Sequence, residues 1–171
     1  MDKRTLYLFV GYPGTGKTTV AKIIHETTGA VHLWADQVRQ QVFGKPTLSA
    51  EQTAELYAKL NDMTAQLLDE GKSVIFDTNF NFYNDRESLR ALANQHSADM
   101  KLIWMTTPKD LARTRAVEDT MPQDTRIWGS MALGDFERIS NNLQPPKVEE
   151  QAIELDGTNI DADVVKQKLG L

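Results

Sequence analysis

Residues 6–18 read Leu-Tyr-Leu-Phe-Val-Gly-Tyr-Pro-Gly-Thr-Gly-Lys-Thr. From Gly11 onward the stretch matches the pattern G-x-x-x-x-G-K-[ST] without a mismatch, and an apolar run of strand length precedes it. A helical pattern over residues 17–28 follows, and Gly29 suits the end of that helix. Glycines let backbone N–H groups turn toward phosphate oxygens, and a helix N-terminus adds partial positive charge. The stretch therefore predicts a phosphate-binding loop between a buried strand and a helix.

The same loop supplies the candidate ligands of a nucleotide and its metal. Lys17 is expected to reach the β- and γ-phosphates of ATP and to act in catalysis, and the Thr18 hydroxyl is expected to ligate Mg²⁺. The other expected nucleotide contacts are Gly11, Pro13, Gly14, Thr15, Gly16 and Thr19.

Outward from the loop, apolar runs alternate with helical patterns, which predicts βαβ units and a parallel sheet. The expected fold is α/β: a P-loop three-layer sandwich with about five parallel strands flanked by helices, in a single domain over residues 1–171. The predicted strands are 6–10, 30–35, 72–76, 101–105 and 152–155. The predicted helices are 17–28, 36–43 (stopped by Gly44 and Pro46), 49–70 (with a capping box from Ser49 to Gln52), 85–95, one starting near Pro108, 130–142 and 162–169.

Composition excludes several classes of protein. The chain has 171 residues, 40% of them hydrophobic, and no cysteine, so disulfides, thiolate metal sites and cysteine nucleophiles are excluded. The net charge of -5 argues against a protein that coats nucleic acid in general, but it does not exclude a local basic groove. No apolar run reaches the length of a membrane span, and Thr5–Val10 is too short for a signal peptide, so a cytoplasmic protein is expected.

Asp77 follows the predicted strand 72–76, at the edge of the sheet where ligands bind in open α/β folds. A carboxylate there is expected to serve Mg²⁺ directly or through water. The alternative is that Asp77 only starts a turn with Thr78 and Asn79.

Asp36 and Arg39 lie one helical turn apart after the second predicted strand. The carboxylate could accept the proton of an acceptor hydroxyl, and the guanidinium could hold an anionic group of that acceptor. The alternative is a helix-capping Asp beside a solvated Arg, and spacing alone does not decide between them. The chain lacks the Asn-Lys-x-Asp signature of GTPases.

The order of these motifs resembles that of the small P-loop kinases, which include the 5′-polynucleotide kinase domain, the zeta toxins and the chloramphenicol phosphotransferases. The similarity in pattern covers nearly the whole chain. The resemblance implies that Asp36 is a general base, that Arg39 binds a phosphate of the acceptor, and that Asp77, Thr78 and Asn79 lie on the substrate and metal side.

The resemblance also implies a lid at about residues 113–127, with Arg113 contacting the nucleotide and acting in catalysis. The second lid arginine of the family is missing, because Val117 stands at its position before Met121-Pro122. Arg115 or Arg126 could replace it. Residues 116–125 are polar and are expected to form a loop.

These observations predict a kinase that transfers the γ-phosphoryl group of ATP to a hydroxyl acceptor. The acceptor could be a polynucleotide or nucleotide 5′-OH, or a small molecule such as an antibiotic, a sugar or a nucleotide-sugar. A nucleotide-binding regulatory module that is not a kinase is the other class left open. His25, His32 and His96 lack metal-ligand spacing, and surface or packing roles are expected for them.

Overall fold

The computed structural model describes residues 4–44, 47, 49–121 and 123–171. Its centre is a parallel sheet of five strands in the order β2-β3-β1-β4-β5. The strands are β1 (Thr5–Val10), β2 (Val31–Trp34), β3 (Val74–Asp77), β4 (Asp99–Met105) and β5 (Ile153–Leu155).

The first strand lies in the middle of the sheet because it is apolar on both faces. Residues 6–10 are all buried, and the strand pairs with β3 (Leu6 beside Val74) and with β4 (Leu8 beside Leu102). A continuous apolar run is typical of a parallel strand covered on both faces. The P-loop therefore leaves the sheet at its centre.

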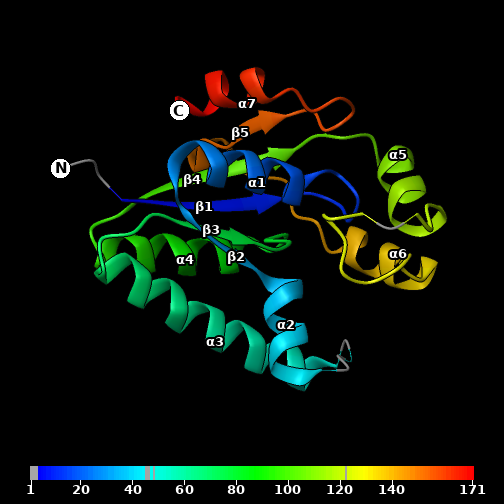
Figure 1. The fold of residues 1–171 in the computed structure, drawn as a ribbon, viewed down its shortest axis with the longest axis horizontal. Coiled ribbons are helices and arrows are strands. Elements are labelled where there is room, and N and C mark those ends of the chain that lie inside the picture. Colours follow the sequence, from blue (N-terminus) through cyan, green and yellow to red (C-terminus); the bar gives the residue numbers. More distant parts are fainter. Residues whose placement is uncertain (1–3, 45–46, 48, 122) are drawn as a thin grey trace.

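Helices cover both faces of the sheet (Figure 1). On one face α1 (Lys17–Thr28) and α7 (Ala162–Leu169) pack on a core that includes Phe9 and Ile75. On the other face α3 (Ala50–Asp69) and α4 (Tyr83–Gln95) pack on a core that includes Phe76. The predicted three-layer α/β sandwich is confirmed.

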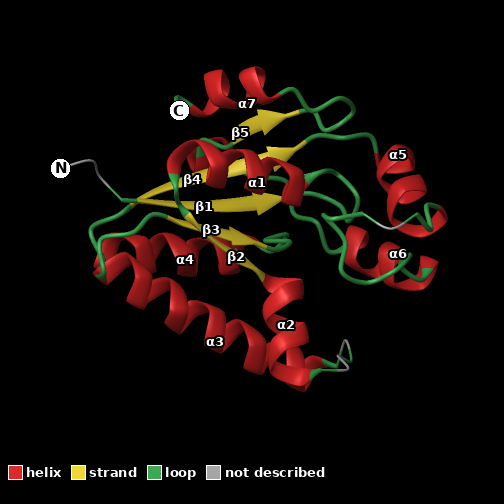
Figure 2. Cartoon of the chain, in the orientation of Figure 1, coloured by secondary structure: helices red, strands yellow, loops and turns green. Residues whose placement is uncertain are grey.

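The remaining helices gather beyond the carboxyl ends of the strands (Figure 2). They are α2 (Ala35–Phe43), α5 (Lys109–Arg113), a π-helical turn (Thr114–Glu118) and α6 (Leu133–Asn141); a 3₁₀ turn (Val148–Glu150) precedes β5. Ala112, Ala116 and Phe136 form a small apolar cluster of their own in this region. This end of the sheet is where every predicted site residue was expected.

Several predicted boundaries were wrong. Ala35 opens α2 and does not end β2, and the segment expected to be a loop from residue 116 stays helical to Glu118. Only half of the capping box forms: the Ser49 hydroxyl accepts from the Gln52 N–H, but the Gln52 side chain accepts from the Thr47 N–H. The predicted stop at Pro46 and the proline of the Met121-Pro122 pair fall on residues outside the described ones. Among described residues, no helix is long and apolar enough to cross a membrane.

Candidate active site

The P-loop runs from the end of β1 into α1, and glycine is required at two of its turns. Gly14 and Gly16 have φ angles of +84° and +97°, in the left-handed region that favours glycine. A Cβ at Gly14 would lie 2.3 Å from the Ala112 carbonyl oxygen. The loop can therefore take this shape against α5 only with glycine at that position.

Lys17 is buried against its own loop. Its Nζ donates to the carbonyl oxygens of Tyr12 at 2.5 Å and Gly11 at 3.2 Å, and to the Thr15 hydroxyl at 3.2 Å. Burial lowers the pKa of Lys17 to about 8, although the nearby carboxylates of Asp77 and Asp36 act in the opposite direction. Phosphate oxygens arriving here would stabilise the ammonium and raise that pKa.

The P-loop is tied to the ends of two other strands. The Thr107 hydroxyl, just after β4, donates to the Thr15 carbonyl at 3.0 Å and accepts from the Gly157 N–H, just after β5, at 3.0 Å. A Cβ at Gly157 would lie 1.9 Å from the Thr15 carbonyl oxygen. Close contacts with the segments that follow β4 and β5 thus fix the position of the loop.

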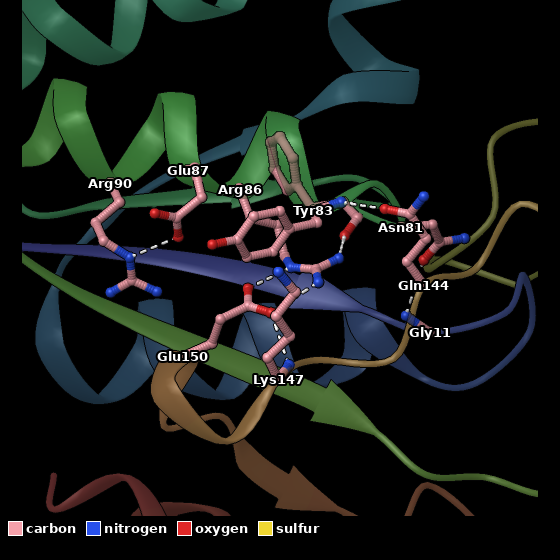
Figure 3. A network of polar contacts seen from close by, with 10 residues as sticks. Gly11, Asn81, Tyr83, Arg86, Glu87, Arg90, Gln144, Lys147 and Glu150 are labelled. Atoms are coloured by element: carbon pink, nitrogen blue, oxygen red, sulfur yellow. Dashed lines mark hydrogen bonds and ion pairs between the residues drawn. The ribbon is translucent and has the colours of Figure 1, made fainter.

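On its other side the P-loop is held by Asn81, which the sequence analysis missed (Figure 3). The buried Asn81 Oδ1 accepts from the Gly11 N–H at 3.3 Å. The Asn81 carbonyl accepts from the Gln144 N–H at 2.8 Å, and the Gln144 side chain accepts from the Tyr83 N–H at 2.7 Å. Asn81 therefore connects the start of the loop to the segment that follows α6.

Below this network lies a fully buried ion pair, also missed. Arg86 on α4 donates to Glu150 at 2.6 and 2.9 Å and to the Phe80 carbonyl at 3.0 Å. Burial opposes ionisation of Glu150, but the hydrogen bonds from Arg86 and the Lys147 N–H, together with the charges of Arg86 and Arg90, outweigh it and hold the pKa of this carboxyl below its usual value. The Lys147 ammonium lies 3.5 Å from the centre of the Tyr83 ring. Periodicity gives no sign that one arginine of a polar helix is buried.

Asp77 ends β3 as predicted and is buried, with 4% of its surface exposed. Its Oδ2 lies 2.9 Å from His32 Nε2. The expectation that His32 has a surface or packing role omitted this contact. Next to Asp77, the Thr78 hydroxyl bonds the Tyr57 hydroxyl at 2.8 Å, and the Asn79 Oδ1 is buried without a hydrogen-bond partner among the described residues.

Asp36 and Arg39 occupy different environments on α2. Asp36 is open to solvent, yet the protein packed around it and the charge of Asp77 raise its pKa, against the opposing effect of Arg39 and Lys17. Arg39 is buried and donates only to neutral groups, the Thr47 carbonyl at 3.3 Å and the Thr53 hydroxyl at 3.5 Å. In the described part of the chain no carboxylate pairs with it.

The helix-capping alternative for this pair was wrong on both counts. The residue that caps α2 is Trp34, which places Asp36 inside the first turn, and Arg39 is not solvated. The Asp36 carboxylate is close enough to Lys17, Asp77 and Arg39 for their charges to interact.

The lid arginines also differ from one another. Arg113 is partly exposed, its Nη2 lies 4.0 Å from Glu118, and its Nε is buried without a partner among the described residues. Arg115 donates to the carbonyls of Gly157 at 2.7 Å and Thr158 at 3.0 Å, and Arg126 donates to the carbonyls of Asp119 and Arg115. The structure thus gives both candidate replacements structural contacts, and Arg113 keeps donors available.

The donor set fits Mg²⁺ held jointly with phosphates. Within the described residues, no three His, Asp or Glu side chains group as a metal cage. Mg²⁺ at phosphate sites needs only one or two protein ligands beside phosphate oxygens and water. Thr18, at the start of α1, and Asp77 could provide them.

A family model described as an AAA domain matches residues 6–122, from the second residue of β1 into the lid. No curated protein matches the chain.

Solved structures with the same fold are numerous. A putative kinase from Chloroflexus aurantiacus J-10-fl is 22% identical, with a TM-score of 0.76 over 99% of this chain and 96% of that chain. The Mycobacterium tuberculosis APS kinase CysC in complex with AMPPNP and APS is 18% identical, with a TM-score of 0.67 over 98% and 95%. A chain of the Pnkp1/Rnl/Hen1 RNA repair complex is 18% identical, with a TM-score of 0.65 over 84% and 45%. The fold expected from the resemblance to small P-loop kinases is confirmed.

Proposed function

This chain belongs to the AAA domain family, and from that premise we propose that it is a P-loop kinase, which transfers the γ-phosphoryl group of ATP to a hydroxyl acceptor. The observation that carries the proposal is the convergence of Lys17, Asp36 and Asp77 at the carboxyl edge of the sheet. The charges of these three groups interact, and each comes from a different segment of the chain. A phosphate cradle beside a carboxylate with a raised pKa suits transfer to a hydroxyl.

The nucleotide would bind through the P-loop. The backbone N–H groups of residues 11–16 and the N-terminus of α1 would hold its phosphates, and Lys17 would exchange loop carbonyls for phosphate oxygens. Thr18 and Asp77 would hold Mg²⁺, which offsets charge on the phosphates when bound. Arg113 would approach the phosphates from the lid.

Asp36 would act as the base and Arg39 as the acceptor clamp. A carboxylate of raised pKa accepts a hydroxyl proton more readily than an ordinary one. Among the described residues the buried Arg39 guanidinium donates to neutral groups only, and the charge of Asp36 acts on it without an ion pair. An anionic acceptor group would supply direct compensation. Thr78 and Asn79 would contact the acceptor from the end of β3.

The clamp favours an acceptor that carries a phosphate, sulfate or carboxylate near its hydroxyl. A nucleic-acid 5′ end and a small anionic molecule both satisfy this. Two of the structures with this fold are a kinase holding APS and a protein of an RNA repair complex.

The experiment is a transfer assay with γ-labelled ATP and a panel of oligonucleotides, nucleotides, sugar acids, neutral sugars and aminocyclitols. We expect label on an anionic acceptor in the wild type and none with Lys17→Ala, since Lys17 contacts charge that develops during transfer. Circular dichroism would verify that the variant is folded.

The second candidate, a slowly hydrolysing regulatory module, is favoured by one observation: Arg115 and Arg126 are both bound to backbone carbonyls, and Val117 has no charge. A kinase releases ADP faster when its acceptor is present. If no acceptor of the panel changes the rate of ADP release, the regulatory module is the better description.

A further inference from the structure

His32 makes the contact that fixes the orientation of Asp77. It lies on the edge strand β2, where Trp34 pairs with Asp77, and its ring reaches Asp77 diagonally across the two strands. Nε2 lies 2.9 Å from Asp77 Oδ2, and the two side chains are 14% and 3% exposed. The ring also stacks on Trp34, with centroids 6.2 Å apart and planes within 12°.

Asp77 requires such a contact. Its carboxylate is buried near the like charge of Asp36, which repels it, and near the ammonium of Lys17, which attracts it. In the described part of the chain, His32 is the one side chain that hydrogen-bonds it. With Oδ2 engaged by the imidazole, Oδ1 has no hydrogen bond from a side chain of the described residues and is available to another ligand.

We propose that His32 is a positioning residue, which fixes the Asp77 carboxylate so that its second oxygen serves the Mg²⁺ of the bound nucleotide. The inference rests on the proposed function. Partners of ligating groups restrict their orientation, and losing one typically costs about 10–100-fold in metal affinity or activity.

The chain contains a matched control. His96 and Asp69 form another His–Asp pair, at 2.6 Å, but Asp69 is 66% exposed and the pair lies at the opposite end of the sheet from the P-loop. Removing this imidazole removes the same kind of contact without touching the site.

The surroundings of His32 permit substitution. The ring borders an open groove of about 580 Å³ between α1 and β2. A phenylalanine would keep the ring shape and the stacking on Trp34 but would lose the hydrogen bond. A glutamine would lose the ring but place an N–H donor near Asp77.

The test compares the wild type with His32→Phe, His32→Gln and His96→Phe. Calorimetry would give the affinity for AMPPNP in Mg²⁺ and in EDTA, and the ratio of the two is the gain from the metal. We expect His32→Phe to reduce this ratio about 10-fold or more with an unchanged affinity in EDTA, and to lower kcat with an unchanged acceptor KM. His32→Gln should recover most of both, and His96→Phe should match the wild type.

Three results would overturn the inference. One is a ratio in His32→Phe equal to that of the wild type. Another is an equal loss in Mg²⁺ and EDTA that His32→Gln does not rescue, because that pattern belongs to a structural residue. The third is a wild type that gains nothing from Mg²⁺. The transfer assay tests the kinase separately, so labelled acceptor with any of these results would leave the kinase intact and remove only the role of His32.

Discussion

The Lys17 ammonium is buried, and this burial lowers its pKa to about 8. The charged form binds phosphate and the neutral form does not. The affinity of the free protein for ATP should therefore be full below about pH 8 and fall as the pH rises through that value. Calorimetric titrations with AMPPNP between about pH 7 and 9 would measure this.

The control is Lys17→Arg, because a guanidinium keeps its charge throughout that range. Whatever its affinity, it should be independent of pH. A wild type with constant affinity to pH 9 would show that Lys17 stays protonated throughout that range and would contradict the prediction.

Asp36→Asn should lower kcat about 10²–10⁴-fold and leave the affinity for ATP nearly unchanged, because Asn keeps the shape but cannot take the proton. Since the protein packed around Asp36 and the charge of Asp77 raise the pKa of Asp36, wild-type activity should fall as the pH drops through that raised value. The residual activity of Asp36→Asn should lack this acid limb. Rate profiles against pH at saturating acceptor would show both effects.

Arg39→Ala separates the clamp from the base. It should raise the acceptor KM more than it lowers kcat, because Arg39 holds a group that does not react. If Asp36→Asn kept a near-normal kcat, Asp36 would be a carboxylate that tunes Lys17 and not the base.

The candidate residues that could be predicted are those whose neighbours in sequence reveal them. Lys17 stands in a local pattern that contains strand, loop and helix, and Asp77 ends an apolar run. His32 and Asn81 could not be predicted, because their partners Asp77 and Gly11 lie 45 and 70 residues away. A single sequence shows which side chains could form hydrogen bonds but not which segments the fold brings together.

Among the elements, the buried Arg86–Glu150 pair joins α4 to the turn before β5 (Figure 3), and Arg86 also bonds the carbonyl of Phe80, the residue before Asn81. Arg86→Met should lower the free energy of unfolding by about 3–5 kcal/mol, because it leaves the Glu150 charge buried without its partner. Urea unfolding at neutral pH would measure the loss.

The double variant Arg86→Met/Glu150→Met is the control, since it removes both charges and should recover much of the loss. The folded pKa of Glu150 is depressed, so the stability that the wild type gains from this carboxylate should be present at neutral pH and be lost as the pH falls through the depressed value. If Arg86→Met were as stable as the wild type, relaxation or water near Glu150 must compensate the charge.

Helices with strong local signals could be predicted closely. The first helix was placed at its observed bounds because Gly16 and Gly29 take left-handed conformations at its two ends. The π-helical turn after α5 was missed because its support is tertiary: Ala116 packs on Phe136, and the Arg115 side chain bonds carbonyls after β5. Polar composition alone indicated a loop there.

At the scale of the whole molecule, the fold class followed from one βα unit and the alternation of strands and helices. The acceptor did not, because it depends on which side chains from distant segments come together, and local patterns do not define that. The prediction of a lid at about residues 113–127 rests on the resemblance and stays a prediction.

The lid should be the part of the ordered chain that changes most when nucleotide binds. Its apolar cluster, Ala112, Ala116 and Phe136, is separate from the two cores on the sheet and meets the P-loop through Tyr12. Beyond Glu118 it is held to the body by Lys22 and Asp124, at 2.9 Å, and exposed pairs of this kind hold weakly. Hydrogen exchange in residues 119–127, the part of the predicted lid beyond Glu118, should therefore be fast without nucleotide and slow down with AMPPNP and Mg²⁺, while β1, β3 and β4 stay protected throughout.

The variant Lys22→Gln isolates the weak contact, and Lys166→Gln on α7 removes a comparable exposed pair, with Asp163 at 3.7 Å, far from the lid. Lys22→Gln should speed exchange in residues 119–127 of the free protein and raise the acceptor KM slightly, because a lid that opens more easily excludes water less often. Lys166→Gln should change neither. Exchange in the lid as slow as in the strands, with no response to nucleotide, would mean that the segment is a fixed wall of the site and that closure takes place elsewhere, with α2 and the start of α3 as the next place to look.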